Sequence, residues 1–283
     1  MNKTFLALAL TAFASSSFAY NTQLDAGFTY FDHDNDWIDS HGLFEAKGTY
    51  YLAPVETKTA PLNEAAFLGH NSNVYAKYSY QYWNSEDYYD EYDIGVGIAK
   101  DETDTHKISA GVEYYLDQIY LNGEIGFGRQ KDKYQVQFDD FTYNEKNDYD
   151  VTLYRAMVGF MPLTNLLLAA GIDGYKGDGD DKDNALALRA KYVAPIGQDG
   201  QFINLEADGT FGDLDTITLG ADYYFDQTFS IGAAYNKQDD GDFDTDSFAV
   251  RTKYFINPSL AVGGAVGFGD DVQNLNLNAT FRF

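Results

Sequence analysis

Apolar and polar residues alternate along most of the chain, most strictly in the last ten residues. Segment 274–283, NLNLNATFRF, places Leu275, Leu277, Ala279, Phe281 and Phe283 at every second position, with polar residues between them. Successive side chains of a β-strand point to opposite faces, so the segment predicts a strand with one apolar and one polar face. A strand of a soluble sandwich alternates in the same way, but a terminal aromatic residue is characteristic of the last strand of an outer-membrane barrel. We therefore predict an all-β fold, a transmembrane antiparallel up-and-down β-barrel.

Short and long links between the apolar stretches divide into two sets. Tight polar turns join neighbouring apolar stretches within 114–121, 160–168, 193–203, 223–230 and 254–262. Acidic segments that contain glycine occupy 32–42, 139–148, 176–184, 212–215, 237–246 and 269–272. Bacterial barrels have short periplasmic turns and longer extracellular loops, so we expect the first set in the periplasm and the second outside the cell.

Region 84–105 decides the number of strands. Its segment YDIGVGIAK, 92–100, has the pattern of a strand between two acidic turns, and counting it as a spanning strand gives fifteen. Bacterial single-chain barrels have even strand counts with both termini in the periplasm. We therefore predict that 84–105 is one long extracellular loop with its own extended piece. The fourteen predicted strands are 23–32, 42–52, 73–83, 106–116, 119–137, 149–160, 165–175, 184–194, 201–212, 216–225, 229–236, 247–255, 260–268 and 273–283.

The same alternation assigns charged side chains to the barrel interior. A Lys or Arg facing lipid at the midplane costs roughly 2–4 kcal/mol, so the polar register of each strand must point inward. Eight acidic and nine basic residues follow this register, which makes the wall nearly neutral. We predict that the following line a pore, with Asp222 beside them: Asp25, Glu45, Lys47, Lys77, Lys107, Glu113, Glu124, Arg155, Asp173, Arg189, Lys191, Glu206, Asp208, Arg251, Lys253 and Arg282. Side chains fill a barrel of about eight strands, whereas a wider one holds water or a plug. We favour a water-filled lumen over an interior closed by salt bridges.

One link on the short-turn side is far longer than the others. Segment 53–72, APVETKTAPLNEAAFLGHNS, contains a proline followed by residues that favour a helix. Its apolar residues are too numerous for a free turn in water, so we hypothesise that the segment tucks into or across the periplasmic mouth. The candidate plug residues are Pro61, Leu62, Glu64 and Phe67. The alternative is a short helix packed on the barrel rim.

The first nineteen residues have the features of a secretory signal peptide. A short charged start with Lys3 precedes an apolar run at 5–14 and the small-residue sequence SFA at 17–19. This predicts cleavage after Ala19, a mature chain that begins at Tyr20, and export to the outer membrane of a Gram-negative cell. No later stretch has the roughly 20 apolar residues that a spanning helix needs.

Composition narrows the possible partners. The chain has 24 Tyr and 21 Phe among its 283 residues but a mean hydropathy of only −0.39, which suits strands that show lipid every second side chain. Its net charge of −25 disfavours nucleic acid and anionic surfaces. We expect contacts with outer-membrane lipid and lipopolysaccharide, with small hydrophilic solutes, and with the barrel-assembly machinery through the strand that ends at Phe283.

The residues that could support catalysis or metal binding do not form a recognisable site. The four His are scattered, and His106 and Ser109 lie on opposite faces of one strand. Aspartate runs at 32–36, 178–183 and 239–246 lack the Gly and Glu positions of a calcium-binding EF-hand loop. We expect no enzyme activity, no cofactor and no specific metal site, and we take the acidic runs as solvated loops. With no Cys, thiolate chemistry is excluded.

A specific block then points to a family. TAPLNEAAFLGHNSNV, 59–74, followed by a Tyr-rich strand, resembles the signature of the general porin family of gamma-proteobacteria. The aromatic short turns and terminal Phe283 extend the resemblance over the mature chain. It implies a small gated outer-membrane porin, monomeric, with a constricted pore. The loops are more acidic than expected for that family, so no solute-binding residue is carried over.

These observations lead to one expected function and one alternative. We expect passive diffusion of small hydrophilic solutes, with a weak preference for cations because the mouth is acidic. The alternative is a surface interaction protein, an adhesin or envelope-stabilising barrel with a closed lumen. Tyr88, Tyr89 and Tyr92 are the residues that such a surface would use first.

Overall fold

The computed structural model describes residues 19–34, 37–57, 60–92, 95–177, 179, 182–197, 200–241 and 244–283. The predicted signal peptide, except Ala19, lies outside these residues. The strands are β1 (Ala19–His33), β2 (Ile38–Glu56), β3 (Asn73–Ser85), β4 (Tyr88–Tyr92), β5 (Gly95–Leu116), β6 (Ile119–Gln137), β7 (Thr142–Leu163), β8 (Leu166–Lys176), β9 (Lys182–Ile196), β10 (Gln201–Phe211), β11 (Asp215–Tyr224), β12 (Phe229–Asp239), β13 (Asp244–Asn257), β14 (Leu260–Gly269) and β15 (Val272–Arg282).

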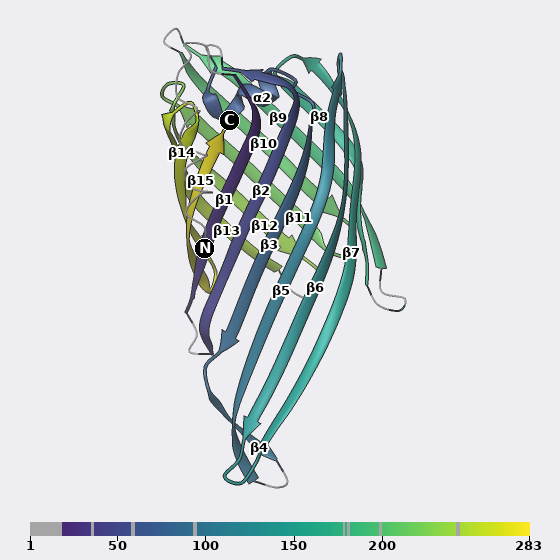
Figure 1. Cartoon of the computed structure of the whole chain (residues 1–283), viewed down its shortest axis with the longest axis vertical. Coiled ribbons are helices and arrows are strands. Elements are labelled where there is room, and N and C mark those ends of the chain that lie inside the picture. Colours follow the sequence, from purple (N-terminus) through teal and green to yellow (C-terminus); the bar gives the residue numbers. More distant parts are fainter. Residues whose placement is uncertain are drawn as a thin grey trace, which may run out of the picture.

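Fourteen of these strands form a closed antiparallel barrel (Figure 1). Each strand pairs with its neighbours in sequence, β3 pairs with β5 across the short β4, and β1 pairs with β15 from Gln23↔Arg282 to His33↔Val272. Strand β4 pairs with β5 and lies outside the ring. Closure leaves no free edge within the ring, so its backbone groups can be satisfied inside a membrane. The predicted fold class and the count of fourteen spanning strands are confirmed.

Alternating exposure along β15 shows how the sequence produces this wall. Leu275 and Leu277 are exposed on the outside, at 48% and 62%, whereas Thr280 and Arg282 are buried inside, at 1% and 2%. The outer face is therefore apolar and the inner face polar, as the alternation of β15 predicts. The described residues include no helix that is long and apolar enough to cross a membrane.

The two ends of the barrel differ. At one end, which we call the short-turn end, all five predicted tight links connect consecutive strands: β5 to β6, β7 to β8, β9 to β10, β11 to β12 and β13 to β14. The C-terminus lies there too, and the Phe283 carbonyl accepts hydrogen bonds from the backbone N–H groups of Asn21 and Thr22. The same end holds the only helical turns in the described part of the chain, the 3₁₀-helix η2 (Leu62–Glu64) and α2 (Ala65–Leu68).

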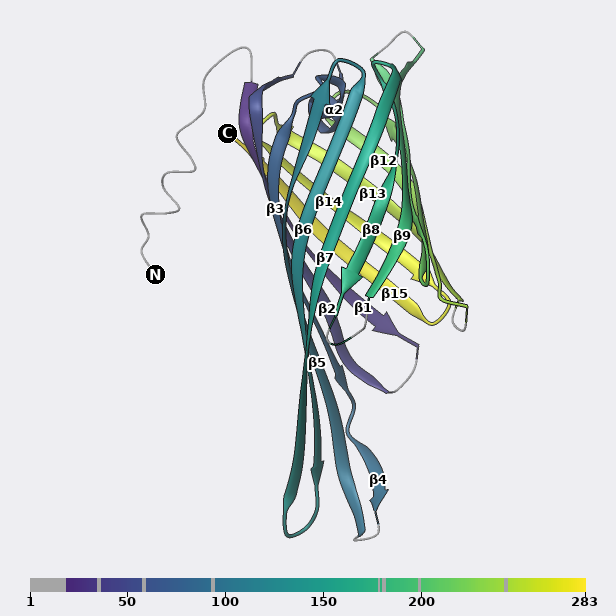
Figure 2. The same ribbon diagram turned by 90° about the vertical axis from the view of Figure 1, so that its right-hand side faces the viewer.

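Strands β5, β6 and β7 project far beyond the opposite end of the barrel (Figure 2). They have 22, 19 and 22 residues, about twice the 9–11 that a tilted spanning strand needs. The expected loop 84–105 is instead mostly strand: β3 continues to Ser85, β4 follows, and β5 begins at Gly95. Likewise, β7 starts at Thr142, inside the expected loop 139–148. These segments pair beyond the barrel, where both faces meet water. Apart from the strand-like 92–100, they therefore lack the apolar alternation that marks a spanning strand.

Candidate functional site

Residues 61–68 lie inside the barrel at the short-turn end and contact its wall on three sides. Leu62 packs with Phe255 and Ala261 of β13 and β14. Ala65 packs with Tyr20, Tyr51 and Val55 of β1 and β2. On the third side, Phe67 packs against a cluster from β6 to β9, formed by Tyr120, Met157, Met161, Leu167, Ala169 and Ala187. The segment therefore crosses the interior of this end instead of resting on the rim.

Polar contacts fix the segment at its centre. Glu64 is 1% exposed and forms an ion pair with Lys191 of β9, with 2.8 Å between Nζ and Oε2. The Tyr224 hydroxyl on β11 donates a hydrogen bond of 2.5 Å to Glu64 Oε1. The Leu62 N–H donates to the Gln227 carbonyl at 2.8 Å, and Arg282 Nη1 donates to the Leu62 carbonyl at 2.9 Å. Every anchor comes from a different strand or turn, so the segment ties together walls that are distant in sequence.

The charge of Glu64 depends on these partners. Burial by itself would raise its pKa, because a carboxylate loses hydration. The ion pair with Lys191 and the hydrogen bonds from Tyr224 and Asn63 outweigh that effect, and the pKa of Glu64 lies below its ordinary value. Glu64 is thus held ionised, as an acceptor for an ammonium group and a hydroxyl.

The local sequence explains why the chain turns inward here. Pro61 has φ −55° and no N–H, which suits the residue that precedes a helical turn. The return to β3 is fixed by His70, whose φ of 50° reverses the chain and whose Nε2 lies 2.8 Å from the Thr164 carbonyl. Asn71 then donates to the Ala53 and Pro54 carbonyls, both at 3.3 Å. Because β2 extends to Glu56, the inserted segment is shorter than the expected 53–72.

Ion pairs cover one part of the inner wall. Arg155 of β7 pairs with Asp173 of β8 and, at 3.3 Å, with Asp208 of β10. Arg189 of β9 lies 2.8 Å from Asp208 and 3.7 Å from Glu113 of β5. Strands β6, β7 and β8 separate Arg189 from Glu113 around the ring, so this chain of alternating charges bridges part of the lumen.

A second cluster continues the same paired surface. Arg251 of β13 lies 2.6 Å from Glu206 of β10 and 2.8 Å from Asp222 of β11. Asn204 donates a further hydrogen bond of 3.0 Å to Asp222. From β7 to β13, the predicted inward arginines thus have carboxylate partners on neighbouring or facing strands.

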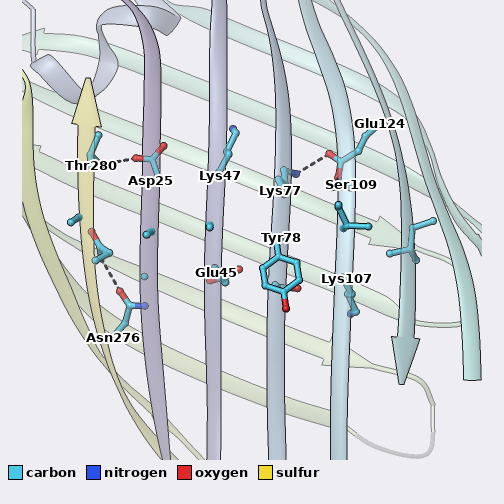
Figure 3. A pocket seen from close by; sticks show the side chains of 18 of the residues that line it. Asp25, Glu45, Lys47, Lys77, Tyr78, Lys107, Ser109, Glu124, Asn276 and Thr280 are labelled. Atoms are coloured by element: carbon cyan, nitrogen blue, oxygen red, sulfur yellow. Dashed lines mark hydrogen bonds and ion pairs between the residues drawn. The ribbon is translucent and has the colours of Figure 1, made fainter. Parts of the chain in front are cut away.

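The rest of the wall surrounds a cavity of about 580 Å³ (Figure 3). Strands β1, β2, β3, β5, β6, β13 and β15 contribute its charged and polar lining, which includes Asp25, Glu45, Lys47, Lys77, Lys107, Glu124, Lys253 and Asn276. Only one ion pair forms among these residues, between Lys77 Nζ and Glu124 Oε2 at 2.8 Å. Glu124 also accepts hydrogen bonds from Tyr75 at 2.6 Å and Ser109 at 2.7 Å.

Arg282 differs most from its expected place. The alternation of its strand predicts that it faces a pore, but it is 2% exposed and is covered by the inserted segment. Its guanidinium stacks over the rings of Tyr20 and Phe255, with its carbon 4.5 and 4.6 Å from the ring centroids, and its Nε donates to Gln23. Arg282 therefore supports the segment instead of contacting solute space.

Several tyrosines at the site could not be identified from their pattern. Tyr75, Tyr120 and Tyr224 all face inward. Their hydroxyls donate hydrogen bonds to the carboxylates of Glu124, Glu113 and Glu64, at 2.6, 2.7 and 2.5 Å respectively. Their spacing in the strands placed them inside, but an inward tyrosine looks the same whether it packs or binds a carboxylate. No group of three or more His, Asp or Glu is placed to hold a metal ion in the part of the chain that the structure describes.

The candidate surface residues occupy the projecting strands. Tyr88 is held by a hydrogen bond of 2.8 Å to Asp101 and by its ring contact with Trp37. Tyr89, by contrast, is 82% exposed. The side chain of Tyr92 lies outside the described part of the structure.

Comparison with known proteins gives a family and a set of similar folds. The model of the family described as "Putative general bacterial porin" matches residues 3–283. The outer membrane protein Omp33 of Acinetobacter baumannii is 24% identical, with a TM-score of 0.61, and the match covers 94% of this chain and 99% of that one. The toluene transporter TbuX of Ralstonia pickettii is 6% identical at a TM-score of 0.62, covering 94% and 90%. The translocator domain of the autotransporter NalP from Neisseria meningitidis is 11% identical at 0.50, covering 93% and 89%. No curated protein matches the chain.

Proposed function

Since the chain belongs to the general bacterial porin family, we propose that it is an outer-membrane porin through which small hydrophilic solutes diffuse passively. The observation that carries this proposal is the charged, polar cavity of about 580 Å³ on the inner wall. An interior closed by salt bridges would have its charges paired with one another. Unpaired charges on the wall instead indicate a lumen in which water and solutes contact them. Family membership and outer-membrane barrel folds support a channel in that membrane. No catalytic role is proposed.

The lengths of the connections support one orientation of the barrel in the membrane. We place the short-turn end, with both termini of the mature chain, in the periplasm and the projecting strands β4 to β7 outside the cell. In this orientation the terminal strand β15, ending near Phe283, is available to the assembly machinery from the periplasm. We propose that lipopolysaccharide surrounds the outer part of the wall and that the protein functions as a monomer.

Segment 61–68 is the proposed gate. Its three-sided packing and the ion pair of Glu64 with Lys191 hold it across the periplasmic mouth. Release of the segment would widen that mouth without any change in the barrel. Deleting residues 61–69 should therefore raise single-channel conductance or the time spent open. Unchanged conductance and open time in a folded deletion variant would refute a gating role.

Ion preference is set mainly at the mouths. The inner wall has nearly balanced charges, but the chain as a whole carries −25, mostly in the projecting strands and the connections outside the membrane. Cations are thereby concentrated near the entrance, an effect that weakens as salt shortens the Debye length from about 10 Å at 0.1 M. We propose a weak preference for cations.

A second function is favoured by one observation. Strands β4 to β7 project beyond the barrel, and Tyr89 of β4 and Tyr143 of β7 are 82% and 48% exposed (Figure 2). This surface suits contact with another envelope or host protein. Shortening the β6–β7 hairpin distinguishes the two functions, since a pore retains its conductance whereas an interaction protein loses its partner.

A further inference from the structure

The charges around the cavity in Figure 3 are of both signs and are largely unpaired. Within the described residues, no carboxylate lies within 4.0 Å of the ammonium groups of Lys47, Lys107 and Lys253. By the same criterion, no cationic group contacts the carboxylates of Asp25 and Glu45. The arginines of β7, β9 and β13 are all paired, so the interior has a paired half and an unpaired half.

Neighbouring contacts hold these opposite charges apart. Asp25 and Lys47 face each other across β1 and β2, where side chains are close enough to pair. Asp25, however, accepts hydrogen bonds from Thr280 at 2.6 Å and Gln23 at 2.8 Å. The Lys47 ammonium lies 4.8 Å from the centroid of the Tyr75 ring. Each charge is therefore positioned by a neutral group and remains available to a solute.

A second pair of opposite charges lies further apart. Glu45 of β2 faces Ser79 of β3, and Ser79 faces Lys107 of β5. Strands are about 4.8 Å apart, so the backbones of Glu45 and Lys107 are separated by roughly 10 Å at the same level. Ser79 lies between them in the register of the strands. The cavity thus offers one short and one long spacing between a carboxylate and an ammonium group.

We propose, on the premise that the protein is a porin, that this unpaired half of the wall selects zwitterionic solutes of the amino-acid class. The solute's ammonium group contacts Asp25 or Glu45, and its carboxylate contacts Lys47, Lys107 or Lys253. A simple cation or anion meets repulsion as well as attraction on this wall, whereas a zwitterion matches both signs. Passage requires binding that is favourable but weak, and charges in a wet cavity provide it.

The test compares two isomers of equal size in liposomes that contain the purified protein. Alanine is zwitterionic at pH 7, whereas lactamide has the same atoms and no charge. Swelling of liposomes in isosmotic solutions gives the two entry rates. We expect alanine to enter at least threefold faster than lactamide through the native protein.

The variants separate the charges from the pore. Through the variant with five substitutions, D25N/E45Q/K47M/K107M/K253M, alanine and lactamide should enter at rates within about 1.5-fold of each other. The matched control K146Q/D148N changes exposed charges on the projecting part of β7 and should keep the native ratio. If the ratio of alanine to lactamide entry rates is the same for the native protein and the variant with five substitutions, the zwitterion proposal is overturned, whereas the proposed porin function still stands. No lactamide entry, in either the native protein or the 61–69 deletion variant, would instead overturn the porin function itself.

A second measurement uses only the native protein and so does not depend on whether the variants fold. Alanine added to a planar bilayer should reduce the current through single native channels as it occupies the cavity, whereas lactamide at the same concentration should not. Equal effects of the two isomers on the current would also overturn the proposal.

Discussion

Replacement of Glu64 by Gln removes the charge that anchors the proposed gate while keeping the side chain's shape. Glu64 is 1% exposed, its Oε2 lies 2.8 Å from Lys191 Nζ, and Lys191 is 26% exposed. Removing one partner of such a buried pair costs about 3–5 kcal/mol. Gln can still accept the Tyr224 hydrogen bond, so we take about 3 kcal/mol. At about 1.4 kcal/mol per factor of ten, the balance between the inserted and released segment shifts roughly 100-fold toward release.

Single-channel recording measures this shift as a change in the fraction of time spent open. We expect E64Q to open far more often than the native channel. K191M should do the same, and the double variant E64Q/K191M should show less than the sum of the two effects, because the charges act on each other. The exposed E145Q on β7 is the matched control. An open fraction of folded E64Q within twofold of the native value would refute the claim that this ion pair holds the gate.

Further predictions concern pH, ion preference and stability. The pKa of Glu64 is lowered in the inserted state, so its contribution to the stability of the inserted segment is complete above its ordinary pKa and is lost as the pH falls. The open fraction should therefore be constant from about pH 7 to about pH 5 and rise below about pH 5. In a tenfold KCl gradient, the reversal potential should indicate cations, and a potential favouring anions would contradict the acidic-mouth argument. Asp226 accepts hydrogen bonds from the Thr228 N–H and hydroxyl and from the Phe229 N–H. D226A should therefore lower the free energy of unfolding, measured by urea titration, by about 1 kcal/mol. A Cβ on Gly171 would clash with the Ala156 carbonyl oxygen, so G171A should reduce the heat-resistant folded band on gels. Substitution of Gly200, which has open space around it, by Asn should not.

The spanning part of the fold follows from the sequence because lipid imposes a strict rule there. Each strand must show an apolar side chain at every second position, so the alternation of 274–283 and the five tight turns identified barrel and connectivity. The rule fails beyond the membrane. Residues 101–105 and 142–150 form strands whose two faces meet water, and their composition looks like that of loops.

The candidate site could be predicted only in part, for a related reason. Register places a charged residue inside but does not decide which inward charges pair. Arg189 and Glu113 approach across three intervening strands, a contact set by the curvature of the barrel. Arg282 and Lys253 both occupy inward-facing positions of their strands, yet the inserted segment covers Arg282. Such contacts depend on where residues 61–68 settle, and their own sequence indicates only an apolar helical turn.

Single-channel conductance of the purified mature protein in planar bilayers, with and without residues 61–69, tests the central claim most directly. The account predicts openings in both proteins, more frequent or larger after the deletion. Silence in both folded proteins, at low and high salt, would contradict the porin function and favour a barrel whose projecting strands carry the activity.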